Sequence, residues 1–278
     1  MSASGLSVGF RSFKLKQGRR FIFFAAFAAL AAYFAPLTGL AFLLCGVLDV
    51  SRHRKLSYEL IDRYFLGNGV STWLLSPVNL FADLISRRNP GIYKIEDMPA
   101  EQRSEIETCV RAFVENGDRI KEHLSGVSSR SRRTMLTFKW FGAAQPLDLR
   151  IAEFERDFRH IKTIAISVLN TRERTSRHFG PLRLTFRVLY NLEPVNGNDV
   201  FIEVDGVTHY WKDNPLFIFD DTFFHMSVND VDQIRYCLFM DVVRPNYFQP
   251  AFDFMVSITS FVMGSAKSIF YRKWSFVR

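Results

Sequence analysis

Short strand-like runs, repeated at close spacing, dominate the sequence between residues 164 and 243. The runs are rich in β-branched and aromatic residues and comprise Ile164–Leu169, Thr185–Leu192, Val200–Val204, Thr208–Trp211, Leu216–Phe219 and Arg235–Val243. Asp205-Gly206 lies between two of them, and this dipeptide favours the type I′ turn of a β-hairpin, whose two central residues need a positive φ. Strands this short and this closely spaced favour an antiparallel barrel or sandwich over a helical fold.

Two histidines within this region stand in distinctive contexts. His178 begins the motif H-F-G-P, and His225 ends the motif F-D-D-T-F-F-H. Arg187 follows the first motif, Arg235 follows the second, and D-V-V-R-P closes the region. One histidine alone is more often a packed or surface residue, and we interpret His209 in this way, but the complete set in this order is specific. The pattern indicates a small β-barrel that carries a metal.

This set of motifs resembles the aspartyl/asparaginyl β-hydroxylase family, whose members are iron(II)- and 2-oxoglutarate-dependent oxygenases. The resemblance extends from Ile164 to Pro245. It implies a mainly β fold, with a double-stranded β-helix (a jelly-roll, cupin-like core) over residues 134–250 and helices at its flanks. The motif S-P-V-N at residues 76–79 and the hydrophobic N-terminus resemble the branch that hydroxylates fatty acyl chains of bacterial membrane lipids, namely lipid A and ornithine lipids.

The resemblance implies a role for each residue of the set. His178 and His225 would bind iron(II) through neutral imidazoles and leave neighbouring positions open for the co-substrate and O₂. Arg235 and Ser167 would hold the far carboxylate of 2-oxoglutarate, because a planar guanidinium matches both carboxylate oxygens. Arg187 would be a catalytic residue and a second co-substrate arginine. An arginine inside an apolar run such as L-T-F-R-V-L-Y favours a buried anionic partner over a surface ion pair.

The chain departs from the usual oxygenase pattern at two positions. Gly180 stands where many of these enzymes carry a carboxylate as the third metal ligand; animal members of the family also have glycine there, whereas lipid A hydroxylases have aspartate. Halogenating relatives lack this carboxylate because a halide takes its place, so a halogenase is a minor alternative. Leu189 replaces a second basic residue of the co-substrate site. Asp220 and Asp221 are expected to form a turn and to orient an imidazole; a rival interpretation makes one of them the missing iron ligand.

The N-terminal part is unusually apolar. Phe21–Leu48 contains no charged residue and is longer than the roughly 20 residues that a spanning helix needs. Pro36 and Gly39 interrupt it, and basic residues flank both ends, so charge does not select an orientation. We therefore expect a membrane anchor within residues 1–55, either as one long, kinked helix or as a re-entrant hairpin.

The remaining segments flank the predicted core. Residues 56–133 are expected to be a helical, amphipathic linker region that includes a polar helix from Pro99 to Leu124. Its basic end at residues 126–133 (G-V-S-S-R-S-R-R) is interpreted as a solvated surface loop rather than as a clamp for a phosphate or carboxylate. Residues 251–278 predict an amphipathic C-terminal helix that lies on the core or on a bilayer surface.

Charge and cysteine content exclude several classes of protein. The net charge is +8, and the basic clusters flank apolar stretches. No nucleic-acid-binding motif accompanies them, so we expect an anionic membrane surface as the partner and no nucleic acid. The three cysteines, Cys45, Cys109 and Cys237, are scattered, which indicates thiols in a reducing compartment rather than a disulfide framework or a zinc site.

These observations predict an Fe(II)- and 2-oxoglutarate-dependent dioxygenase that uses O₂ to hydroxylate a fatty acyl chain at C2, next to its carbonyl group. The substrate would be a membrane lipid such as lipid A or an ornithine lipid. Because 2-oxoglutarate is cytosolic, the catalytic domain should face the cytoplasm at a bacterial inner membrane. A membrane-anchored peptide aspartyl/asparaginyl β-hydroxylase is one alternative. A catalytically inactive binding module, suggested by Gly180 and Leu189, is another.

Overall fold

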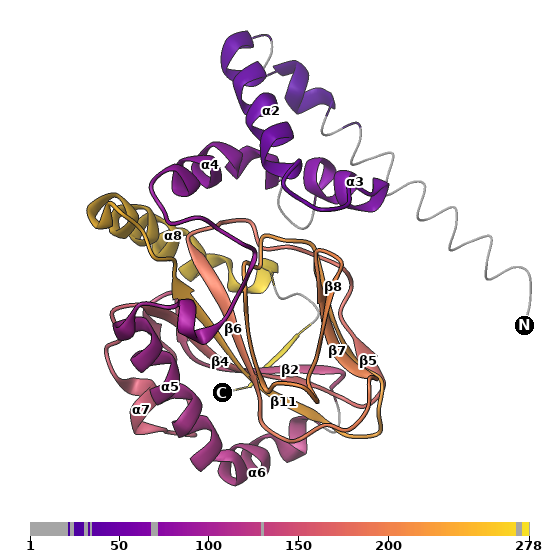
Figure 1. Cartoon of the computed structure of the whole chain (residues 1–278), viewed down its shortest axis with the longest axis vertical. Coiled ribbons are helices and arrows are strands. Elements are labelled where there is room, and N and C mark those ends of the chain that lie inside the picture. Colours follow the sequence, from indigo (N-terminus) through magenta and orange to yellow (C-terminus); the bar gives the residue numbers. More distant parts are fainter. Residues whose placement is uncertain are drawn as a thin grey trace, which may run out of the picture. The chain divides into compact units, whose positions relative to one another are not determined.

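The computed structural model describes residues 22, 25–30, 33, 35–67, 72–128, 131–270 and 274–277, with the backbone alone for residues 128 and 263–270. The chain divides into two compact units, Met1–Leu80 and Phe81–Arg278. The first unit is helical and the second contains the sheets (Figure 1). The whole motif region lies in the second unit.

Short helices build the first unit. They are α2 (Pro36–Val50), α3 (Tyr58–Leu66), the 3-10 helix η1 (Thr72–Leu75) and the start of α4 (Ser76–Leu84). Pro36 occupies the start of α2, where its fixed φ suits a helix and its missing N–H costs nothing. The side chain of Ser57 caps α3. Asp49 of α2 is buried, and it accepts hydrogen bonds from Tyr64 (2.7 Å) and Asn79 (3.4 Å), which joins the helices of this unit.

The membrane anchor expected over Phe21–Leu48 lies only partly within the described residues. In that part, residues 22, 25–30 and 33 are helical, residue 35 is not, and α2 begins directly after it. The residue before a proline is disfavoured in the α conformation, which accounts for the interruption. No helix in the described part of the chain is both long enough and apolar enough to cross a membrane. The spanning helix predicted from the sequence is therefore not supported.

Helices pack on one face of the larger sheet in the second unit. They are the 3-10 helix η2 (Ile95–Asp97), α5 (Ala100–Glu115), α6 (Gly117–Ser128) and the short α7 (Ala152–Glu155). A further helix, α8 (Gln249–Phe270), packs through Phe252 and Val256 in a separate cluster with Leu184 and Val243. The polar helix expected from Pro99 to Leu124 is present but divides into α5 and α6 at Asn116. Ile106 and Phe113 are fully buried, so the apolar face of α5 covers the sheet as its spacing predicts.

Two mainly antiparallel sheets form the body of the second unit. Within the described residues, the larger sheet has eight strands, in the order β1 (Ile92–Tyr93), β9 (Leu216–Phe219), β6 (Thr185–Asn191), β11 (Arg235–Val243), β4 (Ile161–Leu169), β2 (Arg133–Trp140) and β12 (Ser275–Val277), with β3 (Ala143–Ala144) paired to β2. The smaller sheet has four, in the order β5 (Glu173–Arg174), β10 (His225–Asn229), β7 (Val200–Val204) and β8 (Val207–Tyr210). The expected mainly β core with flanking helices is confirmed.

From β4 to β11 the chain passes back and forth between the two sheets. β4, β6, β9 and β11 lie in the larger sheet, and β5, β7, β8 and β10 lie in the smaller one. The hairpin predicted at Asp205-Gly206 joins β7 to β8. Asp205 (φ 49°) and Gly206 (φ 79°) both have a positive φ, as a type I′ turn requires, so this prediction is confirmed.

Strand parity decides which residues face the space between the sheets. In β11, Leu238 belongs to the core shared with the helices, whereas Cys237 and Phe239 belong to the core between the sheets. Because successive side chains of a strand point to opposite faces, Arg235 and Asp241 share the side of Cys237 and Phe239. Both charged residues therefore face the interior of the two-sheet body.

The C-terminal segment differs from the single helix predicted for residues 251–278. α8 covers Gln249–Phe270, and Ser275–Val277 form β12, which pairs in parallel with β2. This pairing joins two strands that are more than a hundred residues apart in the chain. No local periodicity carries such a long-range contact.

Candidate active site

The two histidines predicted as metal ligands lie directly opposite each other. His225 begins β10, and His178 lies on the segment before β6. Their backbones exchange two hydrogen bonds, from His178 N to His225 O (2.9 Å) and from His225 N to His178 O (2.8 Å). The centroids of the two imidazole rings are 4.3 Å apart. This separation allows both rings to reach one metal ion, whose bonds to imidazole nitrogen are about 2 Å long.

Backbone carbonyl groups orient both imidazoles. Nδ1 of His178 lies 2.7 Å from the carbonyl oxygen of Ser176, and Nδ1 of His225 lies 2.8 Å from that of Phe223. A carbonyl oxygen only accepts, so Nδ1 is the protonated nitrogen and Nε2 keeps the lone pair that binds a metal. Burial, and next the neighbouring charge of His178, hold the pKa of His225 well below its usual value. His225 is therefore neutral at neutral pH, which is the ligand form.

The carboxylate of Asp221 occupies the space in front of Gly180. The amide of Gly180 donates to the carbonyl oxygen of Asp221 at 2.7 Å. A Cβ added to Gly180 would lie 2.5 Å from Oδ2 of Asp221 and 2.6 Å from both Cγ and Oδ1. Side chains do not make contacts this short, so the present position of Asp221 requires glycine at 180. A carboxylate from a different turn thus lies where the usual motif would place its own.

Arg187 lies between two aspartates, Asp221 and Asp241, and donates a hydrogen bond to each. Its Nη2 donates to Oδ2 of Asp221 at 2.8 Å, and its Nε donates to Oδ1 of Asp241 at 2.9 Å. The guanidinium also lies 3.8 Å from the ring centroid of Phe239. β6 and β11 place Arg187 directly opposite Asp241. The predicted co-substrate arginine is therefore beside the histidine pair, where it binds protein carboxylates.

Arg235 is a buried cation whose hydrogen-bonding capacity is only partly used. Nη2 donates to the hydroxyl of Ser227 at 2.9 Å, and the guanidinium lies 5.1 Å from the ring centroid of Trp211. Nε and Nη1 are buried and find no hydrogen-bond partner among the described residues. Burial lowers the pKa of Arg235. Because unpaired buried donors of a charged group are costly, this arrangement favours binding of an anionic group next to Arg235.

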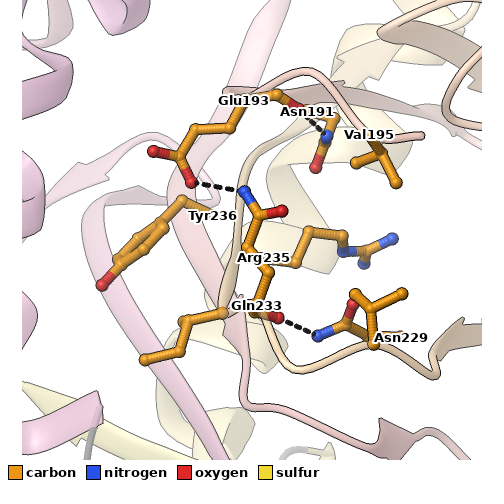
Figure 2. A pocket seen from close by; sticks show the side chains of 9 residues that line it. Asn191, Glu193, Val195, Asn229, Gln233, Arg235 and Tyr236 are labelled. Carbon is orange, nitrogen blue, oxygen red and sulfur yellow. Dashed lines mark hydrogen bonds between the residues drawn. The ribbon is translucent and has the colours of Figure 1, made fainter.

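A pocket opens beside Arg235. It is lined by Asn191, Glu193, Val195, Asn229, Val231, Gln233, Ile234, Arg235 and Tyr236. Figure 2 shows the guanidinium of Arg235 pointing between Val195 and Asn229, away from the carboxylate of Glu193. Glu193 accepts instead from Gln233 and from Lys121, at 3.2 Å each. The acid of this pocket therefore does not neutralise Arg235.

Ser167 lies on the strand next to the one that carries Arg235. It is buried on β4, opposite Cys237 of β11, and faces the same side as Arg235. Its hydroxyl donates to the carbonyl oxygen of Cys237 at 3.3 Å, which is long for an O–H donor. Ser167 thus has a weak partner on the neighbouring strand and shares a side of the sheet with Arg235, two of whose donors find no partner among the described residues.

Leu189 forms part of an apolar wall between the sheets. It is buried and lies opposite Phe239 on one side and Phe217 on the other. The ring of Phe219 lies 5.1 Å from the ring of His225. Where the motif family has a second basic residue, this chain therefore has a continuous apolar surface that reaches the histidine pair.

Residues 89–91, to which no role was assigned from the sequence, hold the turn that contains Asp220 and Asp221 in place. Nδ2 of Asn89 donates to Oδ2 of Asp220 at 2.6 Å, and the amide of Asp220 donates to the carbonyl oxygen of Gly91 at 2.8 Å. Gly91 has a φ of 84°, and a Cβ there would lie 2.8 Å from the ring of Phe223. The sequence N-P-G indicates a tight turn, but nothing local indicates its partner.

Asp220 stabilises its own turn, in agreement with the expectation. Its Oδ1 accepts from the amide (2.9 Å) and the hydroxyl (2.5 Å) of Thr222. The two aspartates were also expected to orient an imidazole. At Nδ1 of both His178 and His225, backbone carbonyl groups have this role instead. Two buried arginines, Arg183 and Arg244, donate to the carboxylate of Asp83, and Nε of Arg183 lies 3.6 Å from Asp220. These contacts hold the turn against the segment around Asp83.

Other candidate residues lie outside this arrangement. Arg132 and Arg133, at the end of the segment expected to be a solvated loop, both bind the buried Glu173 at 2.6 Å, and Arg133 begins β2. His209 stacks on Phe217 with ring centroids 4.3 Å apart, as a packed histidine would. No cluster of three or more His, Cys, Asp or Glu side chains that could hold a metal ion occurs in the described ranges. The candidate metal ligands of this part of the chain are thus the histidine pair.

Comparison with known families supports the motif region. Residues 147–245 match the family model described as Aspartyl/Asparaginyl beta-hydroxylase, and the match includes both histidines and both arginines. The resemblance drawn from the motifs is therefore confirmed. A curated relative, the ornithine lipid ester-linked acyl 2-hydroxylase of Rhizobium tropici, is 30% identical over 86 residues. This match covers 31% of the present chain and 31% of that relative, so the chain matches less than a third of the relative's length.

Solved structures show only distant likeness. An oxidoreductase of the 2OG-Fe(II) oxygenase family from Burkholderia pseudomallei is 13% identical, with 44% of this chain and 77% of that chain covered and a TM-score of 0.28. A prolyl hydroxylase from Trichoplax adhaerens, in complex with a hypoxia inducible factor peptide, is 16% identical, with 64% and 95% covered and a TM-score of 0.30. TM-scores this low carry no argument about fold or function.

Proposed function

We propose, on the premise that residues 147–245 form an aspartyl/asparaginyl β-hydroxylase domain, that this protein is an iron(II)- and 2-oxoglutarate-dependent hydroxylase of a fatty acyl chain in a membrane lipid. The observation that carries the proposal is the pairing of His178 with His225. Two reciprocal backbone hydrogen bonds fix their positions, and two carbonyl groups set the tautomer in which Nε2 can bind a metal.

The side chains present fit an iron site. His178 and His225 would hold the ion, and the carboxylate of Asp221 lies at Gly180, where relatives carry their third ligand. Imidazole nitrogen is a donor that suits Fe(II), so the histidine pair would supply the protein ligands. When bound, the iron supplies oxidation of an unactivated C–H bond, with O₂ as the oxidant and 2-oxoglutarate converted to succinate and CO₂. Because a carboxylate lies in front of Gly180, a halide there would meet like charge, so we favour hydroxylation over halogenation.

Arg235 and Ser167 would bind the far carboxylate of 2-oxoglutarate. The two buried donors of Arg235 that have no partner among the described residues would each gain a charge-assisted hydrogen bond, and the hydroxyl of Ser167 would exchange a long bond for a shorter one. Arg187 would act next to the metal. It donates to Asp221 at 2.8 Å and would help to orient the co-substrate.

The apolar wall favours an acyl chain over a charged peptide. Leu189, Phe217 and Phe239 are buried in the apolar core between the sheets, and their side chains offer no hydrogen bond to a peptide backbone. The relative from Rhizobium tropici is named for oxidation of an ester-linked acyl chain at C2. We therefore propose C2 of an acyl chain of lipid A or an ornithine lipid as the target. The enzyme would work at the cytoplasmic face of a bacterial inner membrane, where 2-oxoglutarate is available.

Mass spectrometry of total lipids and of lipid A tests this proposal. Bacterial cells that produce the wild-type chain are compared with cells that produce His225→Ala or the control His123→Ala, whose histidine lies on α6 away from the site. We expect acyl species with one added oxygen in the wild type and in His123→Ala, and their loss in His225→Ala. Unchanged lipids, in cells whose purified protein decarboxylates 2-oxoglutarate with iron, would rule out the lipid substrate and direct attention to peptides.

A further inference from the structure

Helix α8 is apolar on two opposite sides. Phe252 and Val256 are buried and pack with Ala82, Leu184 and Val243 in a small core cluster. On the other side, large apolar side chains are exposed: Phe254 (66%), Ile258 (50%), Phe261 (86%) and Val262 (58%). Their spacing of i, i+4, i+7 and i+8 places them on one stripe of the helix. The first side is explained by the protein core, and the second needs an apolar partner.

The exposed apolar surface continues onto the segments next to α8. The amide of Tyr247 donates to the carbonyl oxygen of Ile85 at 2.8 Å, and that of Arg87 donates to Pro245 at 3.3 Å. The chain that follows α4 therefore runs beside the chain that leads into α8. Exposed apolar side chains occur on both segments: Leu84 (79%), Tyr247 (74%) and Phe248 (55%). Together with the four residues of α8, we call these three residues the apolar face.

Cationic side chains border the apolar face. Arg87 and Arg88 are exposed and follow Leu84 closely in the chain. Of the acids nearby, Asp83 is bound by two buried arginines, and Asp253, on the flank of α8, accepts a hydrogen bond from Gln249 at 2.8 Å. Apolar side chains bordered by arginines are typical of a surface that inserts between anionic headgroups, at about 1 kcal/mol per cation.

The apolar face lies at the end of the sheets that carries the candidate site. Asp83 precedes Leu84, and Arg244 precedes Pro245. Both join Arg183 in the cluster that reaches Asp220, in the turn before the second metal-binding histidine. We propose that the apolar face docks this unit on an anionic lipid bilayer. The consequence that an acyl chain enters the site directly from the bilayer rests on the proposed function, whereas the docking itself does not.

Vesicle binding by the full-length protein tests the docking surface. Cosedimentation is measured with vesicles of phosphatidylcholine alone and with vesicles that also contain phosphatidylglycerol. Three variants are compared: Phe254→Ser/Phe261→Ser removes apolar area, Arg87→Glu/Arg88→Glu reverses the charge, and Val114→Ser changes a residue that is 48% exposed on α5, away from the apolar face. Thermal unfolding of each variant verifies that the fold is retained.

We expect the wild type and Val114→Ser to bind anionic vesicles better than neutral ones. The serine double variant should bind at least about tenfold more weakly, because two large aromatic groups no longer enter the bilayer. The glutamate double variant should lose the preference for anionic vesicles. Unchanged binding by the folded serine variant overturns the proposal. So does a self-association that the serine variant abolishes while vesicle binding stays the same, because the occupant would then be a second copy.

Failure of the docking proposal can be distinguished from failure of the proposed lipid hydroxylase function. If docking is correct and the lipid hydroxylase is not, the serine variant binds vesicles poorly and no acyl chain is oxidised by any variant. If the reverse holds, wild type and serine variant oxidise lipid equally and bind vesicles equally.

Discussion

The close approach of Gly180 to Asp221 predicts that the substitution Gly180→Ala is destabilising although it adds only one methyl group. The new Cβ would lie 2.5–2.6 Å from three atoms of the Asp221 carboxylate, so the carboxylate must move. Moving it breaks the 2.8 Å bond to Arg187, in a pair whose side chains are each 12% exposed. Overpacking costs about 1–3 kcal/mol, and loss of a charge-assisted hydrogen bond costs a similar amount.

Urea denaturation of the metal-free protein measures this cost. We expect Gly180→Ala to lower the free energy of unfolding by about 1–3 kcal/mol, or the melting temperature by about 2–4 °C per kcal/mol. Gly126→Ala is the matched control: Gly126 lies in α6 with nothing within 4 Å of an added Cβ, so alanine there should be neutral or stabilising.

A double-mutant cycle shows whether the carboxylate is the cause. In an Asp221→Ala background the space in front of Gly180 is empty, so Gly180→Ala should then cost much less than in the wild type. Two results would refute the reasoning. One is a Gly180→Ala protein as stable as the wild type, and the other is a cost that is the same with and without the Asp221 carboxylate.

Three further predictions concern the pocket arginine, the buried histidine and the turn. Arg235→Lys keeps the charge but loses the planar fork, so the KM for 2-oxoglutarate should rise about 10–100-fold while iron binding stays the same; an unchanged KM in steady-state assays would contradict the assigned role. Burial holds the pKa of His225 below that of a histidine in the unfolded chain, so below pH ~6.5 the unfolded state binds the extra proton. The free energy of unfolding should therefore decrease as the pH is lowered below this value, by up to ~1.4 kcal/mol per pH unit. In His225→Gln this pH slope of the urea midpoint should be smaller, and an equal slope would exclude His225 as its source. Asn89→Ala removes the 2.6 Å bond to the fully buried Asp220 and should cost about 1–3 kcal/mol; a loss under ~0.5 kcal/mol would show that the bond is dispensable.

Local signals predict the strands and turns of this chain well. Runs of β-branched and aromatic residues locate β6, β7 and β9 to within a residue or two, and Asp205-Gly206 predicts the hairpin because its backbone conformation is a local property. β10, which begins at His225, was missed because its residues (H-M-S-V-N) are only partly apolar. β12 was missed because its existence depends on pairing with β2, more than a hundred residues away in the chain.

In the candidate site, too, features carried by a sequence motif could be predicted, whereas features that depend on long-range contacts could not. The motif order is enough to pair His178 with His225, because a strand register brings motif positions together. The relation between Gly180 and Asp221 could not be predicted, since a missing side chain carries no sign of what fills its space. The contact of Asn89 with Asp220 was likewise hidden, because it joins the segment before β1 to the turn after β9.

The reciprocal backbone bonds between His178 and His225 have a consequence for the metal-free enzyme. Both amide protons are donated within the protein, so their exchange with deuterated solvent should be slow even in the presence of a chelator. The distance between the two imidazoles is then a property of strand pairing and does not depend on the ion. A protein of this kind should collect its metal after folding is complete, with little rearrangement of the main chain, and should survive cycles of iron loss and reloading without becoming a substrate for proteases.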